Sequence, residues 1–301
     1  MRKDTISLFV FFIAACIVFT PCQAKSKAKH VILIGLDGWG SYSVPKADIP
    51  NIKQLMANGS YTLEKRSALP SSSAINWASM FMGAGPELHG YTEWGSKTPE
   101  LPSCILNKHG IFPTIFQLLR EARPKAEIGC LYEWNGIKYL VDTLALNHYA
   151  QAPNYKEYPE ALCNMAETYI KEKQPTLLAV CFDNPDHIGH QKGHDTPEYY
   201  AKLKELDMYI GRIIRAVEEA GILKETIFII TADHGGINKG HGGKTMQEMQ
   251  TPFIISGKNV KKGMEFHESM MQYDVASTIA YIFGLQQPQV WIGRPMTQVF
   301  K

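Results

Sequence analysis

One stretch decides the fold: Thr226-Ile-Phe-Ile-Ile-Thr-Ala-Asp-His-Gly-Gly-Ile-Asn-Lys-Gly-His-Gly-Gly243, an apolar run that ends in a polar, glycine-rich segment. The β-branched and aromatic residues predict a buried strand, which in a parallel sheet delivers the next residues to its carboxyl-end loop. Asp233, His234 and His241 offer one carboxylate and two imidazoles there, the ligand types of zinc and its first-row neighbours. The glycines permit tight turns. The stretch therefore predicts a metal-binding loop, with an ordinary polar loop as the alternative.

Two more apolar runs end in acidic residues. The segment His30-Val-Ile-Leu-Ile-Gly-Leu-Asp-Gly38 predicts a buried strand with Asp37 at its carboxyl end. The segment Thr176-Leu-Leu-Ala-Val-Cys-Phe182 predicts another, which opens into a polar loop. Ligand-type side chains from all three strands are expected at one edge of the sheet.

The loop after the third run contains several possible ligands. Asp186 and His190 stand four residues apart beside a glycine, so both can face one ion, although a solvated loop is the alternative. His187 and His194 are further imidazoles, for which surface or supporting positions are expected rather than primary ligation.

Strands and helices alternate from residue 30 to the end of the chain. This alternation predicts an α/β fold: a three-layer sandwich with a mostly parallel central sheet and helices on both faces. No repeat or linker interrupts it, so residues 25–301 are expected to form a single domain. The predicted helices are 49–59, 113–122, 159–173, 199–221 and 273–284, and the additional strands are 61–65, 126–132 and 251–257.

A serine cluster precedes an apolar, helix-spaced run in Leu69-Pro-Ser-Ser-Ser-Ala-Ile-Asn-Trp-Ala-Ser-Met-Phe-Met-Gly83. One interpretation is a helix N-cap. A hydroxyl at a helix amino terminus also lies where backbone N–H groups favour an anion, and next to a metal it can attack a phosphoryl centre. Both interpretations stay open at this point.

The amino terminus and the composition indicate where in the cell the protein is expected. A basic start, an apolar run and a small-residue cleavage site predict a signal peptide over residues 1–24, and hence an exported, periplasmic or secreted protein with no membrane span in the mature chain. A retained anchor and a lipoprotein box at Ile13-Ala-Ala-Cys16 are the alternatives. The formal net charge of +2 gives no sign of a nucleic-acid-binding surface.

Four cysteines remain after the predicted cleavage. Their spacing contains no CxxC pair and no dense disulfide framework. Cys130 and Cys181 lie in strand-like runs, so they are expected to be buried thiols rather than nucleophiles.

Taken together, four motifs resemble the alkaline phosphatase superfamily, and most closely its type I phosphodiesterase/nucleotide pyrophosphatase branch. The order and spacing of the motifs agree over nearly the whole mature chain. The resemblance implies the same α/β fold and a two-metal site. The motifs are Gly35-Leu-Asp-Gly38, the serine segment ending in Gly83-Ala-Gly-Pro-Glu-Leu-His-Gly90, Pro185-Asp-x-x-Gly-His190 and Asp233-His-Gly235.

The resemblance implies roles for individual residues. Ser73, thirteen residues before Pro86, would be the nucleophile, with Ser71 and Ser72 as alternatives. Two divalent ions are implied, Zn²⁺ in first place and Mn²⁺ or Mg²⁺ as alternatives. One ion would be held by Asp186, His190 and His241, and the other by Asp37, Asp233 and His234.

The chain departs from the branch at two places. Trp94 occupies the position of an asparagine that binds a phosphate oxygen, so Asn76 or the backbone N–H after Ser73 is expected to replace it. His241 follows His234 by only seven residues, which implies a site with little covering structure. The expected substrate contacts are Trp94, Lys192 and His194, with Lys97, Tyr91 and Trp134 as further candidates.

The expected activity is metal-dependent hydrolysis of small-molecule phosphoric esters, diesters before monoesters, through a phosphoseryl intermediate. A phosphomonoesterase is the first alternative. A sulfatase is the second, although residues 69–73 lack the Cys-x-Pro-x-Arg context that sulfatases use. A secreted binding protein without activity is the third. The oligomeric state is left open.

Overall fold

The computed structural model of the protein describes residues 26–301, and the signal peptide predicted over residues 1–24 lies outside them. The described residues contain one eight-stranded sheet, with strand order β4-β3-β5-β1-β6-β7-β2-β8. Strand β7 runs antiparallel to both of its neighbours, and the other adjacent pairs are parallel. The strands are β1 (His30–Leu36), β2 (Gly59–Arg66), β3 (Ile128–Tyr132), β4 (His148–Gln151), β5 (Leu177–Phe182), β6 (Thr226–Thr231), β7 (Gln250–Gly257) and β8 (Met264–Glu265).

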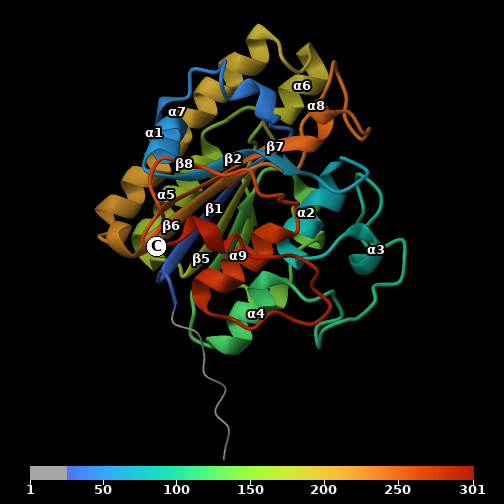
Figure 1. The fold of residues 1–301 in the computed structure, drawn as a ribbon, viewed down its shortest axis with the longest axis vertical. Helices are drawn as coiled ribbons and strands as arrows, with labels where there is room; N and C mark the ends of the chain where they lie inside the picture. Colours follow the sequence, from blue (N-terminus) through green and yellow to red (C-terminus); the bar gives the residue numbers. More distant parts are fainter. Residues whose placement is uncertain (1–25) are drawn as a thin grey trace, which may run out of the picture.

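Helices cover both faces of the sheet (Figure 1). Helices α2, α4 and α9 pack on one face and α1, α5 and α7 on the other, and each face has its own cluster of buried apolar side chains. The predicted three-layer sandwich is therefore confirmed. The helices are α1 (Pro50–Ala57), α2 (Ser73–Met82), α3 (Pro86–His89), α4 (Ile115–Ala122), α5 (Ala161–Lys173), α6 (Asp186–Lys192), α7 (Pro197–Glu219), α8 (Met246–Met249) and α9 (Asp274–Phe283).

Several elements differ from the expectation: β8, α3 and α8 were not predicted, and two further differences concern the polar loop after β5 and the sheet edge. The segment predicted as a polar loop after β5 contains helix α6, which begins at Asp186 and ends before Gly193. It was missed because a seven-residue polar helix has no apolar periodicity. Strand β4 was not predicted either, since it lies at the sheet edge with mostly exposed side chains and no alternating pattern.

The cysteines and the helices bear on two further expectations, buried thiols and a mature chain without a membrane span. Cys130 and Cys181 are buried and unpaired, as predicted, and Cys163 is also buried, whereas Cys104 is exposed. Among residues 26–301, no helix is both long and apolar enough to cross a lipid bilayer.

Candidate active site

The sheet brings three acidic side chains together. Strands β5, β1 and β6 are parallel neighbours, so their carboxyl ends deliver Asp186, Asp37 and Asp233 to one edge. Backbone contacts fix their spacing: the N–H of Asp186 donates to the carbonyl of Asp37 at 2.9 Å. The N–H of Gly38 donates to Asp233 Oδ1 at 3.1 Å.

Gly38 is required at this junction. Its φ of +69° lies in the left-handed region, and a Cβ there would lie 2.6 Å from the Cβ of Asp186. A larger residue would both strain the backbone and push Asp186 away. The glycine after Asp37 therefore allows the close approach of two acidic side chains.

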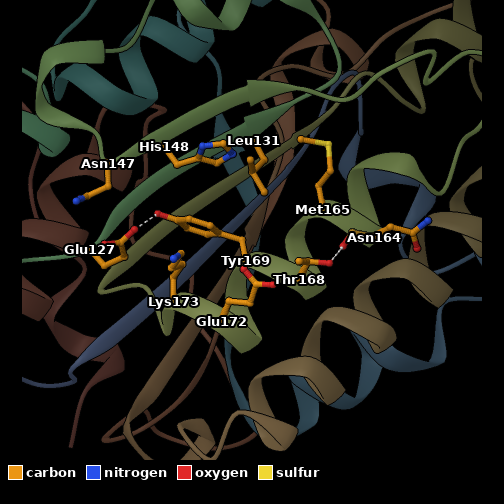
Figure 2. A pocket seen from close by; sticks show the side chains of 10 residues that line it. All are labelled: Glu127, Leu131, Asn147, His148, Asn164, Met165, Thr168, Tyr169, Glu172 and Lys173. Atoms are coloured by element: carbon orange, nitrogen blue, oxygen red, sulfur yellow. Dashed lines mark hydrogen bonds between the residues drawn. The ribbon is translucent and has the colours of Figure 1, made fainter.

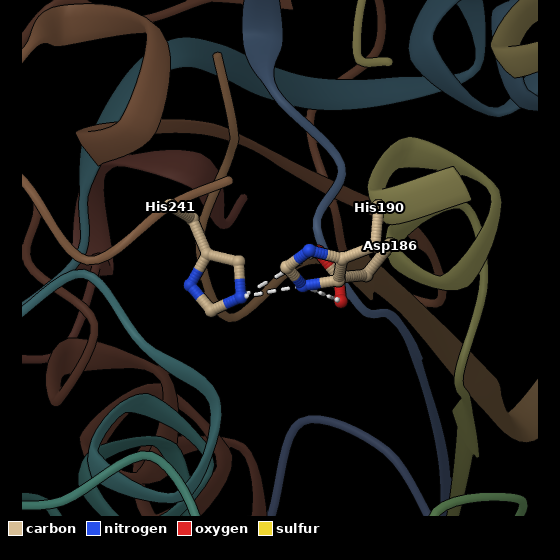
Figure 3. A group of neighbouring side chains, drawn as sticks. All are labelled: Asp186, His190 and His241. Atoms are coloured by element: carbon tan, nitrogen blue, oxygen red, sulfur yellow. Dashed lines mark hydrogen bonds and ion pairs between the residues drawn. The ribbon is translucent and has the colours of Figure 1, made fainter. Parts of the chain in front are cut away.

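One donor group consists of Asp186, His190 and His241 (Figure 3). The Nε2 atoms of the two histidines lie 3.1 Å apart, and His190 Nε2 lies 3.1 Å from Asp186 Oδ2. The Nδ1 atoms face the carbonyls of Lys239, at 2.9 Å, and Ser71, at 3.1 Å. Because a carbonyl only accepts, each Nδ1 carries the proton in the neutral imidazole and each Nε2 presents a lone pair to the centre.

A second donor group consists of Asp37, Asp186 and His234. His234 Nε2 lies 3.4 Å from Asp37 Oδ1 and 3.3 Å from Asp233 Oδ2, while its Nδ1 donates to the carbonyl of Gly235 at 2.7 Å. The structure thus places Asp186 in both groups, with Asp233 bordering the second. The sequence-based prediction had divided the ligands into two separate triads.

Three carboxylate oxygens in this cluster have no hydrogen-bond donor: Asp37 Oδ1, Asp186 Oδ1 and Asp233 Oδ2. Their residues are at most 8% exposed. Buried acceptors are normally satisfied, and buried charges are normally paired or bound to a metal. Converging carboxylate and imidazole donors with unpaired oxygens therefore fit divalent cations.

Ser73 is the serine of the cluster that reaches this centre. It is the first residue of α2, and its Oγ lies 3.1 Å from His234 Nε2. The hydroxyl of Ser71 is fully buried and donates to the carbonyl of Gly243 at 2.6 Å. Ser72 is the N-cap residue of α2, and its Oγ lies 3.5 Å from His241 Nδ1. Of the three serines, Ser73 lines the cavity beside the acidic residues.

Asn76 does not fit its predicted contact with phosphate. It is fully buried, and its Oδ1 accepts from the N–H of Ala68 at 2.6 Å. Its Nδ2 donates to the carbonyls of Ala68, Pro70 and Ser72 at 3.0–3.2 Å. Every polar atom of the amide is occupied, so Asn76 shapes the serine loop. The other expected group, the backbone N–H after Ser73, belongs to Ala74 and donates to the carbonyl of Trp94 at 3.2 Å, so it is occupied as well.

The cavity above the cluster has a volume of about 220 Å³. Trp94, which is 67% exposed, and Trp134 form part of its wall, as the sequence suggested. Tyr155, Lys156 and Asp183 also line it and were not predicted. Tyr155 and Lys156 follow the unpredicted strand β4, so the sequence pattern held no signal that placed them here. The full lining is Asp37, Ser73, Trp94, Trp134, Tyr155, Lys156, Asp183, Asp186, His187, His190 and His241.

Other expected substrate contacts lie elsewhere. Lys192 is exposed on α6 and does not line the cavity, and Tyr91 is buried in the core. Lys97 lies over the ring of Tyr139, 5.9 Å from its centre. His194 is buried, with its Nε2 3.5 Å from Asp186 Oδ1, so it borders a candidate ligand instead of facing substrate. The structure therefore places neither Lys192 nor His194 in the wall of the cavity.

A larger cavity of about 680 Å³ lies beside α5 and β4 (Figure 2). Its wall includes Leu131, His148, Met165 and Tyr169, and the Tyr169 hydroxyl donates to Glu127 at 2.6 Å. None of the predicted site residues lines it. The smaller cavity is therefore the candidate active site.

Burial dominates the electrostatics of the acidic cluster. It raises the pKa of Asp233 to about 7 and, with the charge of Asp233 next, raises the pKa of Asp37 well above its usual value. Burial likewise raises the pKa of Asp183 to about 7 and that of Glu133 to about 8. A hydrogen bond to Asp186 raises the pKa of His190 to about 9. Without cations, the folded protein therefore holds protons that the unfolded chain releases.

The difference in bound protons between the folded and the unfolded state predicts how the stability of the metal-free protein depends on pH. A group with a raised folded pKa contributes stability that is lost as pH rises through that pKa. Lys65 opposes the trend, because burial lowers its pKa to about 7, and burial also lowers the pKa values of His89, His234 and His241. The histidines weaken the slope little above pH 6.5, because an unfolded histidine has already lost much of its proton there. We expect the free energy of unfolding of the chelator-treated protein to fall from pH 6.5 to pH 8.5, measured by urea denaturation.

Saturating zinc should reverse this slope, because metal ligands bind as deprotonated groups and the cation replaces the protons. A metal-free protein that is more stable at pH 8.5 than at pH 6.5 would contradict the expectation.

The sequence is similar to a known protein family and to several curated proteins. Residues 31–245 match the model of a family described as type I phosphodiesterase/nucleotide pyrophosphatase. Mouse bis(5'-adenosyl)-triphosphatase enpp4 is 24% identical over 225 residues, which cover 71% of this chain and 48% of that protein. The catalytic subunit of human GPI ethanolamine phosphate transferase 2 is 28% identical over 146 residues, which cover 46% of this chain and 15% of that protein. The aligned region thus spans about half the length of these curated relatives or less.

Solved structures share the fold. Murine ectonucleotide pyrophosphatase/phosphodiesterase 5, in an inactive form with AMP, superposes with a TM-score of 0.75 at 14% identity, over 91% of this chain and all of that one. A 2-O GAG sulfatase superposes with a TM-score of 0.72 at 15% identity, over 91% of this chain and 74% of that one. At these identities the likeness establishes the architecture alone.

Proposed function

Because the chain belongs to the type I phosphodiesterase/nucleotide pyrophosphatase family, we propose that it hydrolyses phosphoric diesters at the cavity beside Ser73. The observation that carries the proposal is the position of the Ser73 hydroxyl. It lies at the amino terminus of α2, 3.1 Å from His234 Nε2, beside three buried carboxylates with unpaired oxygens. A hydroxyl in this setting suits nucleophilic attack on an anionic phosphorus centre.

Two divalent ions, most simply Zn²⁺, fit the donor atoms of Asp37, Asp186, His190, Asp233, His234 and His241. Bound there, they would supply Lewis-acid stabilisation of the attacking and departing oxygens. The carbonyl partners of the three histidine Nδ1 atoms hold each ring with Nε2 toward the centre.

The protein residues then have separate tasks. Ser73 Oγ bonds to phosphorus while the bond from phosphorus to the leaving oxygen breaks, and the serine proton leaves with the alcohol product. Water next cleaves the phosphoseryl bond, which restores the serine hydroxyl and releases the phosphoryl product. The dipole of α2 favours the negative charge of the phosphoryl oxygens at the amino terminus of the helix, where the N–H of Ala74 already donates to the carbonyl of Trp94 at 3.2 Å.

The cavity wall favours a leaving group with both apolar and polar parts. Trp94, Trp134 and Tyr155 offer aromatic surface, while Lys156 adds a positive charge. Lys156 also supports the second candidate, a phosphomonoesterase, since a monoester carries an additional negative charge that a wall lysine can meet.

We expect the mature protein to hydrolyse bis-p-nitrophenyl phosphate faster than p-nitrophenyl phosphate, and p-nitrophenyl sulfate slowest. The reaction should need zinc and stop with a chelator. Release of p-nitrophenol, followed side by side for the three esters, measures the ranking. Faster monoester hydrolysis would assign the second candidate, and faster sulfate hydrolysis would contradict both.

The proposed setting is outside the cytoplasm. A basic start, an apolar run and a small-residue cleavage site in residues 1–24 support export, and residues 25–301 would then act as one catalytic domain. Mass spectrometry of the protein purified from its native host would give the mature amino terminus.

A further inference from the structure

A buried lysine contacts the segment that carries Asp233 and His234. Lys65 on β2 is fully buried, and its ammonium donates to the carbonyl of Ala232 at 2.9 Å and to Oε1 of Gln272. Ala232 immediately precedes Asp233. A buried amine without a carboxylate in hydrogen-bond contact is costly, so such a residue needs a compensating role.

Gln272 extends the contact to the nucleophile helix. It is also fully buried, and its Nε2 lies 3.2 Å from both the carbonyl of Asn76, in α2, and the carbonyl of Ala232. The amide can reach both carbonyls only if its nitrogen points toward them. The protonated form of Lys65 can only donate, so it requires the oxygen of Gln272 on its own side and sets this orientation.

Lys65 and Gln272 therefore connect two segments that carry residues of the candidate site. One segment is the turn after β6 that carries Asp233 and His234, and the other is α2, which starts at Ser73. We infer that Lys65 and Gln272 form a positioning pair that sets the spacing between the Ser73 hydroxyl and the Asp233–His234 turn. This inference rests on the proposed function only for the identity of the reaction.

The test compares Lys65→Met and Gln272→Leu, which remove the polar contacts and keep much of the volume, with the double variant. Both single variants should lower kcat on bis-p-nitrophenyl phosphate about 10-fold or more, with KM within about two-fold, and weaken zinc binding about 10-fold. The double variant should be no worse than the more affected single variant, because both break the same link.

Thr226→Val is the matched control. It removes one buried hydrogen bond, from Oγ1 to the carbonyl of Ile222, at the opposite end of β6. It should lower the melting temperature yet leave kcat and zinc affinity within about two-fold. This separates positioning from a general loss of stability.

Two results would overturn the inference. One is a Lys65→Met variant with kcat and zinc affinity close to wild type, and the other is tighter zinc binding with unchanged kcat, which would show that Lys65 acts through its charge alone. If the wild type hydrolyses none of the esters, the proposed function fails, while zinc affinity, from competition with a chromophoric chelator, still decides the inference.

Discussion

Replacing Ser73 with alanine should lower kcat for diester hydrolysis by roughly 10³-fold or more, as expected for loss of a nucleophile. The substitution removes one oxygen atom, whose contact is with His234 Nε2, and adds no volume, so the fold should be little affected. Zinc stoichiometry should also stay at the wild-type value, because none of the carboxylate and imidazole donors changes. Stopped-flow release of p-nitrophenol and metal analysis of the same sample measure both quantities.

Ser72→Ala is the matched control for this variant. Its hydroxyl is one residue away, 3.5 Å from His241 Nδ1, and makes no side-chain cap to α2. We expect kcat to change by less than about 10-fold. Full activity in Ser73→Ala would remove the hydroxyl from the mechanism, and a large loss confined to Ser72→Ala would move the nucleophile by one residue.

Asp186→Asn should have the next largest effect, because its carboxylate belongs to both donor groups. Figure 3 shows the group that it forms with His190 and His241. Burial would raise the pKa of Asp186, but the neighbouring imidazoles, those of His190 and His194 first, lower it, so the wild-type side chain stays ionised. An amide removes that charge and one acceptor oxygen. We expect roughly 10²-fold or greater loss of kcat, beyond the loss typical of residues that only support a ligand, together with fewer than two bound zinc ions.

Asp195→Asn provides the comparison on the same segment. Asp195 forms a surface ion pair with Lys46 at 2.9 Å, so its neutralisation should change kcat and zinc content little. Wild-type zinc content in Asp186→Asn would show that the shared position of Asp186 between the two groups is not used.

The sheet and the acidic cluster were predictable because buried parallel strands leave a strong local signal. Apolar runs that end in Asp37 or Asp233 indicate both the strand and the edge to which each side chain is delivered. The short helix α6 left no such signal, but its turn brings His190 back to Asp186, which the four-residue spacing had already suggested.

Contacts that depend on tertiary packing were not predictable. Asn76 was expected to contact substrate, but its side-chain amide forms hydrogen bonds with the backbone of the loop that precedes it. Lys156 lines the cavity and follows the edge strand β4, which the sequence pattern did not indicate. The position of Asp186 within reach of both donor groups follows from its backbone contact with Asp37, which no motif spacing encodes.

The strand order also places the candidate ligands away from the two edges of the sheet. The candidate ligands follow β5, β1 and β6, three inner neighbours, while the marginal strands β4 and β8 carry none of them. Segments added at either margin would leave the inner pairing intact. The fold can therefore gain length at its edges without rebuilding the candidate site.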